Sequence, residues 1–232
     1  MINKFVSSVE EALAGIRDGA TILVAGFGTA GIPEVLIDGL IAANVRDLTI
    51  VNNNAGNGDI GLAALLRTRN VRKIICTYPR SADSHVFNAL YRAGKIELEL
   101  VPQGTLAERL RAAGAGIGAF YCPTGCGTPL ADGKEVRHIN GRDYMLEYPI
   151  HGDYAFIKAE SGDRWGNLTY RMSARNFGPV MATAARTTIA TVHQALELGE
   201  MDPEAIVTPG IFVHRVLPIE RTVTRAVGAP SA

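Results

Sequence analysis

A glycine-rich loop between a buried strand and a helix is the feature that most constrains this fold. The turn Asp18-Gly19 precedes a strand-like run, Ala20–Val24, and the loop after it places glycines at positions 26, 28 and 31, just before Pro33. Proline is favoured at the first position of a helix, where its missing N–H would be unpaired in any case. A strand, a glycine loop and a helix in this order predict an α/β sheet in which the backbone approaches a ligand closely.

The spacing of these three glycines also matches the G-x-G-x-x-G motif of dinucleotide-binding proteins. That class needs an acidic residue near the end of the next strand to bind the ribose hydroxyls. Here the next strand, Leu48–Val51, runs into Asn52-Asn53-Asn54, and the first carboxylate after it is Asp59. Neutral amides provide donors without a competing negative charge, so they suit a carboxylate or carbonyl ligand better than a diol. The sequence therefore argues against a dinucleotide site.

The chain alternates between predicted strands and helices. After the helix at Pro33 we predict a strand at 73–76, a helix at 82–93, a strand at 97–101 and a helix at 106–113, with buried strands again at 155–158 and 187–196. This order predicts an α/β fold with a mostly parallel sheet flanked by helices and with ligands at the carboxyl ends of the strands. With 232 residues, 47% of them hydrophobic, the chain can form a single domain spanning 1–232.

The segment from about 121 to 148 interrupts this alternation. It is rich in proline and glycine, and Asn140-Gly141 stands between two alternating runs, which is a strong β-hairpin signal. We therefore predict a loop and hairpin insertion that forms a flap or an interface arm. The last residues, 225–232, are predicted to be frayed.

Charge and cysteine content exclude several classes of protein. The 23 Lys and Arg residues balance 23 Asp and Glu residues, which argues against nucleic acid or a membrane surface as the main partner. No signal pattern or membrane-spanning run is present, and the odd number of cysteines fits a reducing compartment, so we expect a soluble cytoplasmic protein. Cys122 and Cys126 lack the further ligands that a structural zinc site needs, so no metal is predicted.

Several blocks of the sequence resemble family I CoA-transferases, in particular their A, or alpha, subunits. The resemblance is carried by Asp18-Gly19 with Gly26-Phe27 and Gly31-x-Pro33, and it continues through segments 53–56, 102–109, 163–168 and 174–178. It implies the family's α/β architecture, which is similar to that of glucosamine-phosphate isomerases. Residues 1–4, 162–171 and 208–213 are most similar to members that use 3-oxoadipate. Ala25 departs from the pattern, which has a glycine there.

The resemblance implies exchange of CoA between two carboxylic acids, with a CoA thioester as substrate and no permanently bound cofactor. In this family an enzyme glutamate, found in a Ser-Glu-Asn-Gly-like turn of the B subunit, forms an acyl anhydride and then a glutamyl-CoA thioester. No Glu-Asn-Gly occurs in this chain. The chain is therefore expected to be half of an enzyme and to need a B subunit, in a heterodimer or heterotetramer.

The implied substrates are succinyl-CoA as donor and 3-oxoadipate as acceptor, in the degradation of aromatic compounds. An acetoacetate-type 3-oxoacid transferase is the alternative within the family. A sugar-phosphate isomerase or a stand-alone ligand-binding domain is an alternative of another class. It would require a carboxylate base and a cationic phosphate site in this chain, and the sequence offers no convincing pair.

Seven residues form the predicted site. Gln103 follows the predicted strand 97–101 and is expected to offer its amide to a carboxylate or to the oxyanion of the reaction, as the resemblance also implies. Asn53 and Asn54 are expected to line the same pocket, and the loop residues Gly26, Phe27, Gly28 and Gly31 to shape its wall. The alternatives are that Gln103 caps the helix after it and that the asparagines only satisfy a turn.

Overall fold

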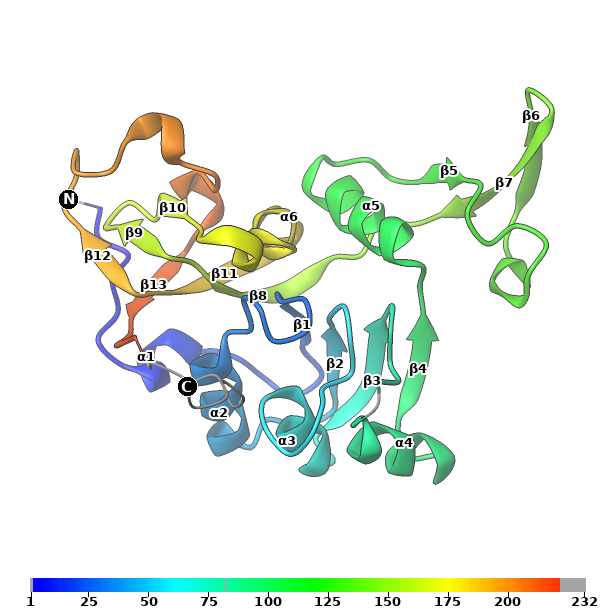
Figure 1. The fold of residues 1–232 in the computed structure, drawn as a ribbon, viewed down its shortest axis with the longest axis horizontal. Coiled ribbons are helices and arrows are strands. Elements are labelled where there is room, and N and C mark those ends of the chain that lie inside the picture. Colours follow the sequence, from blue (N-terminus) through cyan, green and yellow to red (C-terminus); the bar gives the residue numbers. More distant parts are fainter. Residues whose placement is uncertain (1, 82, 222–232) are drawn as a thin grey trace, which may run out of the picture.

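The structure, a computed structural model, describes residues 2–81 and 83–221. A seven-stranded sheet forms its centre, in the order β13-β11-β8-β1-β2-β3-β4, and every neighbouring pair in it is parallel (Figure 1). The strands are β1 (Thr21–Val24), β2 (Leu48–Val51), β3 (Val71–Cys76), β4 (Glu97–Leu100), β8 (Gly152–Lys158), β11 (Ala185–Val192) and β13 (Arg215–Pro218). The predicted α/β fold with a mostly parallel sheet is confirmed.

Helices cover both faces of this sheet. One face packs against α1 (Val9–Leu13), α2 (Glu34–Ala43), α3 (Leu62–Arg67) and α4 (His85–Arg92), and the other against α5 (Gln103–Gly114) and α6 (Gly178–Ala184). Because successive side chains of a strand point to opposite faces, Ile22 and Val24 belong to the first core and Leu23 to the second. Strands buried on both sides explain the near-continuous apolar runs in the sequence.

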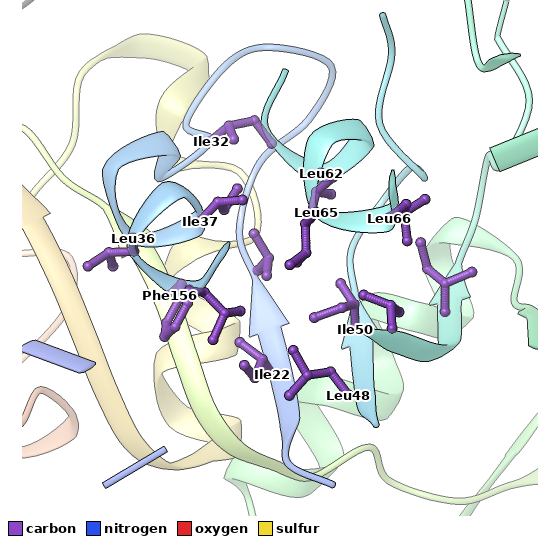
Figure 2. Close-up of a cluster of buried hydrophobic side chains, with 14 of the residues drawn as sticks. Ile22, Ile32, Leu36, Ile37, Leu48, Ile50, Leu62, Leu65, Leu66 and Phe156 are labelled. Carbon is purple, nitrogen blue, oxygen red and sulfur yellow. The ribbon is translucent and has the colours of Figure 1, made fainter. Parts of the chain in front are cut away.

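Figure 2 shows the first of these two cores. Leu36 and Ile37 of α2 and the leucines of α3 lie above the sheet residues Ile22, Ile50 and Phe156 and belong to one cluster with them. These side chains are almost completely inaccessible to solvent. The helices on this face therefore hold the strand ends, and the loops that follow them, in fixed positions.

The helix boundaries refine the predicted ones. Pro33 is the N-cap of α2, so that helix begins one residue after the predicted start. Helix α5 begins at Gln103, three residues earlier than predicted, directly after the extended Pro102. Helix α4 begins only at His85, whereas the predicted start at Ala82 lies outside the described residues.

The strands that follow β1 in the sequence lie first on one side of it in the sheet and later on the other. It first runs from β1 through β2 and β3 to β4, and then comes back to β8, from which it continues to β11 and β13. The loops after β1 and β8 therefore diverge at the carboxyl edge of the sheet. Such a switch in strand order is where ligands bind in open α/β sheets.

Residues 120–147 form a separate antiparallel sheet that projects from the body as an arm (Figure 1). It contains β5 (Phe120–Cys122), β6 (Val136–Ile139) and β7 (Arg142–Glu147), in the order β5-β7-β6. In the segment where the sequence predicts a hairpin, β6 and β7 are joined at Asn140-Gly141, whose φ angles of 49° and 80° suit a tight hairpin turn.

A further small sheet lies beside β11 and contains β9 (Ser161–Asp163), β10 (Leu168–Thr169) and β12 (Gln194–Leu196). Short 3-10 helices lie between these elements, among them η1 (Pro129–Ala131) and η2 (Met172–Arg175). The predicted frayed segment, 225–232, lies outside the described residues. Within the described ranges, none of the helices has both the length and the apolar character needed to cross a bilayer.

Candidate functional site

A pair of side-chain amides marks the carboxyl edge of the sheet. Gln103, the first residue of α5 after β4, donates a hydrogen bond from Nε2 to Oδ1 of Asn53, which follows β2; the distance is 2.7 Å. Asn53 is only 5% exposed, whereas Gln103 is exposed to solvent. The buried amide therefore orients the exposed one, and the second Nε2 hydrogen of Gln103 has no partner among the described residues.

The backbone around Asn53 is fixed as well. Its carbonyl oxygen accepts hydrogen bonds from the amides of Thr77 and Tyr78, at 3.2 and 3.0 Å, so the ends of β2 and β3 are tied together. The hydroxyl of Thr77 is buried without a partner among the described residues. Thr77 is a polar residue next to the site that sequence reasoning missed, because a lone threonine after a strand carries no distinctive signal.

The side chain of Gln103 does not cap its own helix. Pro102 occupies the N-cap position of α5, and no side-chain hydrogen bond is made there. The bond to Asn53, fifty residues earlier in the chain, takes its place. The arrangement therefore differs from the capping alternative considered for this glutamine.

The three consecutive asparagines have different environments. Asn52 is fully buried, donates from Nδ2 to the carbonyl of Val24 at 2.6 Å, and accepts from the amide of Asn54 at 2.8 Å, so it ties β1 to β2. Asn54 accepts a hydrogen bond from the amide of Gly56 at 2.8 Å and lines a neighbouring depression together with Gly28. Of the three, Asn53 is the one in contact with Gln103.

The glycine loop is a tight turn with Phe27 at its exposed corner. The amides and carbonyls of Phe27 and Ala30 bond reciprocally at 3.0 Å, and the Phe27 side chain is 51% exposed. Gly26 and Gly31 have φ angles of +129° and +74°. A Cβ at Gly26 would lie 2.1 Å from Ile32 Cδ1, and one at Gly31 would lie 2.7 Å from a backbone oxygen of η2. Both positions therefore require glycine.

Asn176 holds this loop against the second half of the chain. Its Oδ1 accepts from the amide of Gly26 at 3.1 Å, and its Nδ2 donates to the carbonyl of Ala30 at 3.0 Å. Sequence reasoning placed Asn176 in a family-like block but assigned it no role. Its partners lie about 150 residues away in the sequence, so they could not be predicted from local patterns. The only available signal was that the family-like block containing Asn176 precedes a helix.

These elements enclose a shallow cleft of about 320 Å³, hereafter the amide cleft. It is lined by Phe27, Gln103, Gly104, Ala107, Asn176, Phe177 and Val180. The cleft thus brings together Phe27 and Gln103 of the predicted site, with Asn53 behind Gln103 and with Gly26 and Gly31 shaping the loop. Gly28 and Asn54 face the neighbouring depression instead.

The chemistry of the amide cleft is neutral. None of its lining residues is ionisable, so it offers no nucleophile, acid or base. Both Nδ2 hydrogens of Asn176 are bonded to the carbonyls of Ala30 and Ser173, so the cleft offers the second Nε2 hydrogen of Gln103 and an apolar wall. It suits the binding of a carboxylate or the stabilisation of an oxyanion, because neutral donors act without a proton transfer. In the described part of the chain, no group of three or more His, Cys, Asp and Glu residues is placed to hold a metal ion.

Ala25, where the family pattern has glycine, does not face this cleft. Its methyl group is buried in the core between the sheet and helices α5 and α6. Its amide donates to the carbonyl of Phe156 at 2.9 Å, which extends the pairing of β1 with β8. The substitution therefore affects core packing and does not narrow the approach to the amide cleft.

The chain is similar in sequence to known proteins. A protein-family model described as Coenzyme A transferase matches residues 6–218. The chain is 67% identical over 219 residues to the A subunit of 3-oxoadipate CoA-transferase from Pseudomonas putida, covering 94% of this chain and 95% of that protein. It is 46% identical to the A subunit of succinyl-CoA:3-ketoacid coenzyme A transferase from Helicobacter pylori strain J99, covering 97% and 99% of the two chains.

A solved structure shows the same fold. An acyl-CoA transferase of Escherichia coli O157:H7 superposes with a TM-score of 0.82 at 23% identity and covers 100% of this chain. The present chain spans 50% of the length of that one. The parallel sheet, the glycine loop and the amide cleft therefore lie in a fold that is found in acyl-CoA transferases.

Proposed function

This chain belongs to the coenzyme A transferase family, and from that membership we propose that it is the A subunit of an enzyme that transfers CoA between succinate and 3-oxoadipate. The identity to the 3-oxoadipate relative is well above that to the succinyl-CoA:3-ketoacid relative, which supports 3-oxoadipate as the acceptor. The high identity to the latter makes acetoacetate-type 3-oxoacids the second candidate.

The neutral amide cleft is the observation that carries this proposal. Exchange of CoA between carboxylic acids through an enzyme-bound anhydride requires a carboxylate nucleophile. None of the residues lining the cleft is ionisable, so we expect the nucleophile to come from another chain. We assign it to a glutamate of a B subunit, and the relatives, which are named as A subunits, support such a partner. The two chains would assemble as a heterodimer or heterotetramer.

Gln103 has the principal role in this chain. Each attack on a thioester or an anhydride creates a tetrahedral oxyanion, and Nε2 of Gln103 would donate to that oxygen or to the acceptor carboxylate. Asn53 orients the amide through its 2.7 Å hydrogen bond, so no reorientation is needed when charge develops. Phe27 forms the apolar wall, and Gly26 and Gly31 give the loop that carries it the shape it needs next to the partner's glutamate.

The test is a substitution at Gln103 in the complex with a B subunit. Removing one preorganised donor typically lowers kcat by about 10²- to 10³-fold. We expect that loss in Gln103→Ala, measured as formation of 3-oxoadipyl-CoA from succinyl-CoA. The chain has a second glutamine, Gln194 in β12, which lies outside the amide cleft. Gln194→Ala is the matched control and should retain kcat; equal losses in both variants would refute the assigned role.

The acceptor is tested separately by competition between substrates. The ratio of kcat/KM for 3-oxoadipate and acetoacetate, with succinyl-CoA as donor, measures the preference directly. A ratio above one supports the 3-oxoadipate assignment. A ratio below one would transfer the proposal to the second candidate without affecting the role of Gln103.

A further inference from the structure

A second cleft lies at the same edge of the sheet, at the switch in strand order between β1 and β8. It encloses about 260 Å³ and is formed by the loop after β1, the ends of β8 and β11, and η2. We call it the switch-point cleft; its lining includes Gly31, Lys158, Glu160, Arg171, His193 and Arg221. No lining residue is shared with the amide cleft. The glycine loop contributes residues to both, and η2 of the switch-point cleft is followed directly by Asn176 and Phe177 of the amide cleft, so the two clefts are neighbours.

Positive charge dominates the switch-point cleft. Lys158 ends β8, Arg171 precedes η2 and Arg221 follows β13. Glu160 is the only carboxylate among the lining residues, and it already pairs with Arg221. In the described part of the chain, neither Lys158 nor Arg171 forms a salt bridge. Two cations therefore face the cleft without a counter-charge, an arrangement that favours an anionic ligand.

A polar atom without a partner points to the same conclusion. Nδ1 of His193, which lines the cleft, is buried and makes no hydrogen bond within the described residues. His193 directly follows β11, two residues after Thr191, which pairs in register with Lys158 of β8. Buried polar groups are normally satisfied, and an unsatisfied one at a cleft often marks a missing ligand or water.

The protonation of His193 fits a role as a hydrogen-bond donor. Burial, followed by the nearby charge of Lys158, lowers the pKa of His193 below its ordinary value. A backbone hydrogen bond at Ile219 acts in the opposite direction and engages one ring nitrogen, while Nδ1 is the nitrogen without a partner. An oxyanion held by Lys158 and Arg171 would favour the protonated ring, in which both nitrogens donate.

We propose that the switch-point cleft binds an oxyanion, a carboxylate or phosphate group of a small ligand, with Lys158 and Arg171 as charged partners and His193 as a hydrogen-bond partner. A distal carboxylate of a dicarboxylic acid and a phosphate of a CoA thioester both carry this chemistry. The site does not depend on the identity of the acyl acceptor or on the B subunit's glutamate. Its failure would therefore leave the proposed transferase function intact.

Binding is tested on the full chain by NMR, with the Cε1–H resonance of His193 as the reporter. That resonance is assigned with the variant His193→Gln. Succinate and inorganic pyrophosphate are the probes, and sodium chloride at equal ionic strength is the reference. The variants are Lys158→Met and Arg171→Met, with Lys95→Met as the matched control, because Lys95 is an exposed lysine outside the cleft.

We expect at least one probe to shift His193 saturably beyond the effect of sodium chloride. Loss of one charge-assisted contact should weaken that binding about tenfold in Lys158→Met and Arg171→Met but not in Lys95→Met. A response to succinate identifies the carboxylate as the recognised group, and a response to pyrophosphate identifies the phosphate. If neither probe shifts His193, or if Lys95→Met weakens binding as much as the two cleft variants, the proposal is wrong.

Discussion

Arg109 attaches the arm to the body, and its removal should destabilise the protein strongly. Arg109 lies on α5, only 13% exposed, and bonds to Glu99 through Nη1 at 2.8 Å and to the Tyr148 carbonyl through Nε at 2.7 Å. Glu147, at the end of the arm strand β7, lies 3.8 Å from Nε and is 2% exposed. Its other partner is Lys134, at 2.6 Å.

The magnitude follows from these contacts. Breaking a buried ion pair by removing one partner costs about 3 to 5 kcal/mol. Glu147 keeps Lys134 and Glu99 keeps Lys73, so we expect a cost at or just below the lower end of that range, about 2 to 3 kcal/mol, for Arg109→Met. For a chain of this size, that corresponds to a fall in Tm of about 4 to 12 °C.

Urea unfolding followed by circular dichroism measures this cost. Arg111→Met is the matched control, because Arg111 lies on the same helix and its one ion pair among the described residues is the exposed pair with Glu108. This variant should lose less than about 1 kcal/mol. Because Glu147 lies beside Arg109, the costs of Arg109→Met and Glu147→Gln should not add in the double variant. Equal costs for the two arginine variants would refute this reasoning.

Two further predictions concern pH and the glycine loop. Burial alone would raise the pKa of Glu99, but hydrogen bonds from Lys73 and Arg109 and their charges lower it below its ordinary value of 4.5. The difference in free energy of unfolding between the wild type and Glu99→Gln should therefore be fully present above pH 4.5 and shrink as the pH falls below that value. Urea unfolding at several pH values measures this difference, and a difference that does not change with pH would contradict the prediction. Gly31→Ala should destabilise the protein more than Gly28→Ala does. A left-handed φ costs both variants about 1 to 2 kcal/mol, but only the alanine at position 31 would also contact a backbone oxygen. Equal Tm values for the two glycine variants would show that this contact is relieved at no cost.

Local signals in the sequence were sufficient to predict those elements whose backbone conformation is determined by one or two neighbouring residues. Pro33 marked the start of α2, and Asn140-Gly141 marked the hairpin of the arm, because these residue types have strong backbone preferences. The strand–helix alternation was enough to predict a parallel sheet, since strands joined by helices run in the same direction. The start of α5 was predicted too late because Gln103-Gly104 resembles loop sequence.

Contacts between distant segments could not be predicted in this way. That Asn53, and neither Asn52 nor Asn54, meets Gln103 depends on how the ends of β2 and β4 are rotated, which three consecutive amides do not reveal. The two bonds from Asn176 to the glycine loop join halves of the chain that share no local signal. The site roles of Gln103, Asn53 and the loop residues stay predictions until the variants are measured.

Reconstitution of CoA transfer tests the central claim most directly. The chain alone, a candidate B subunit by itself, and the two together are incubated with succinyl-CoA and 3-oxoadipate, and formation of 3-oxoadipyl-CoA is followed over time. We expect transfer only in the mixture, because the amide cleft has no nucleophile of its own. Turnover by this chain alone, at a rate comparable to that of the mixture, would contradict the account.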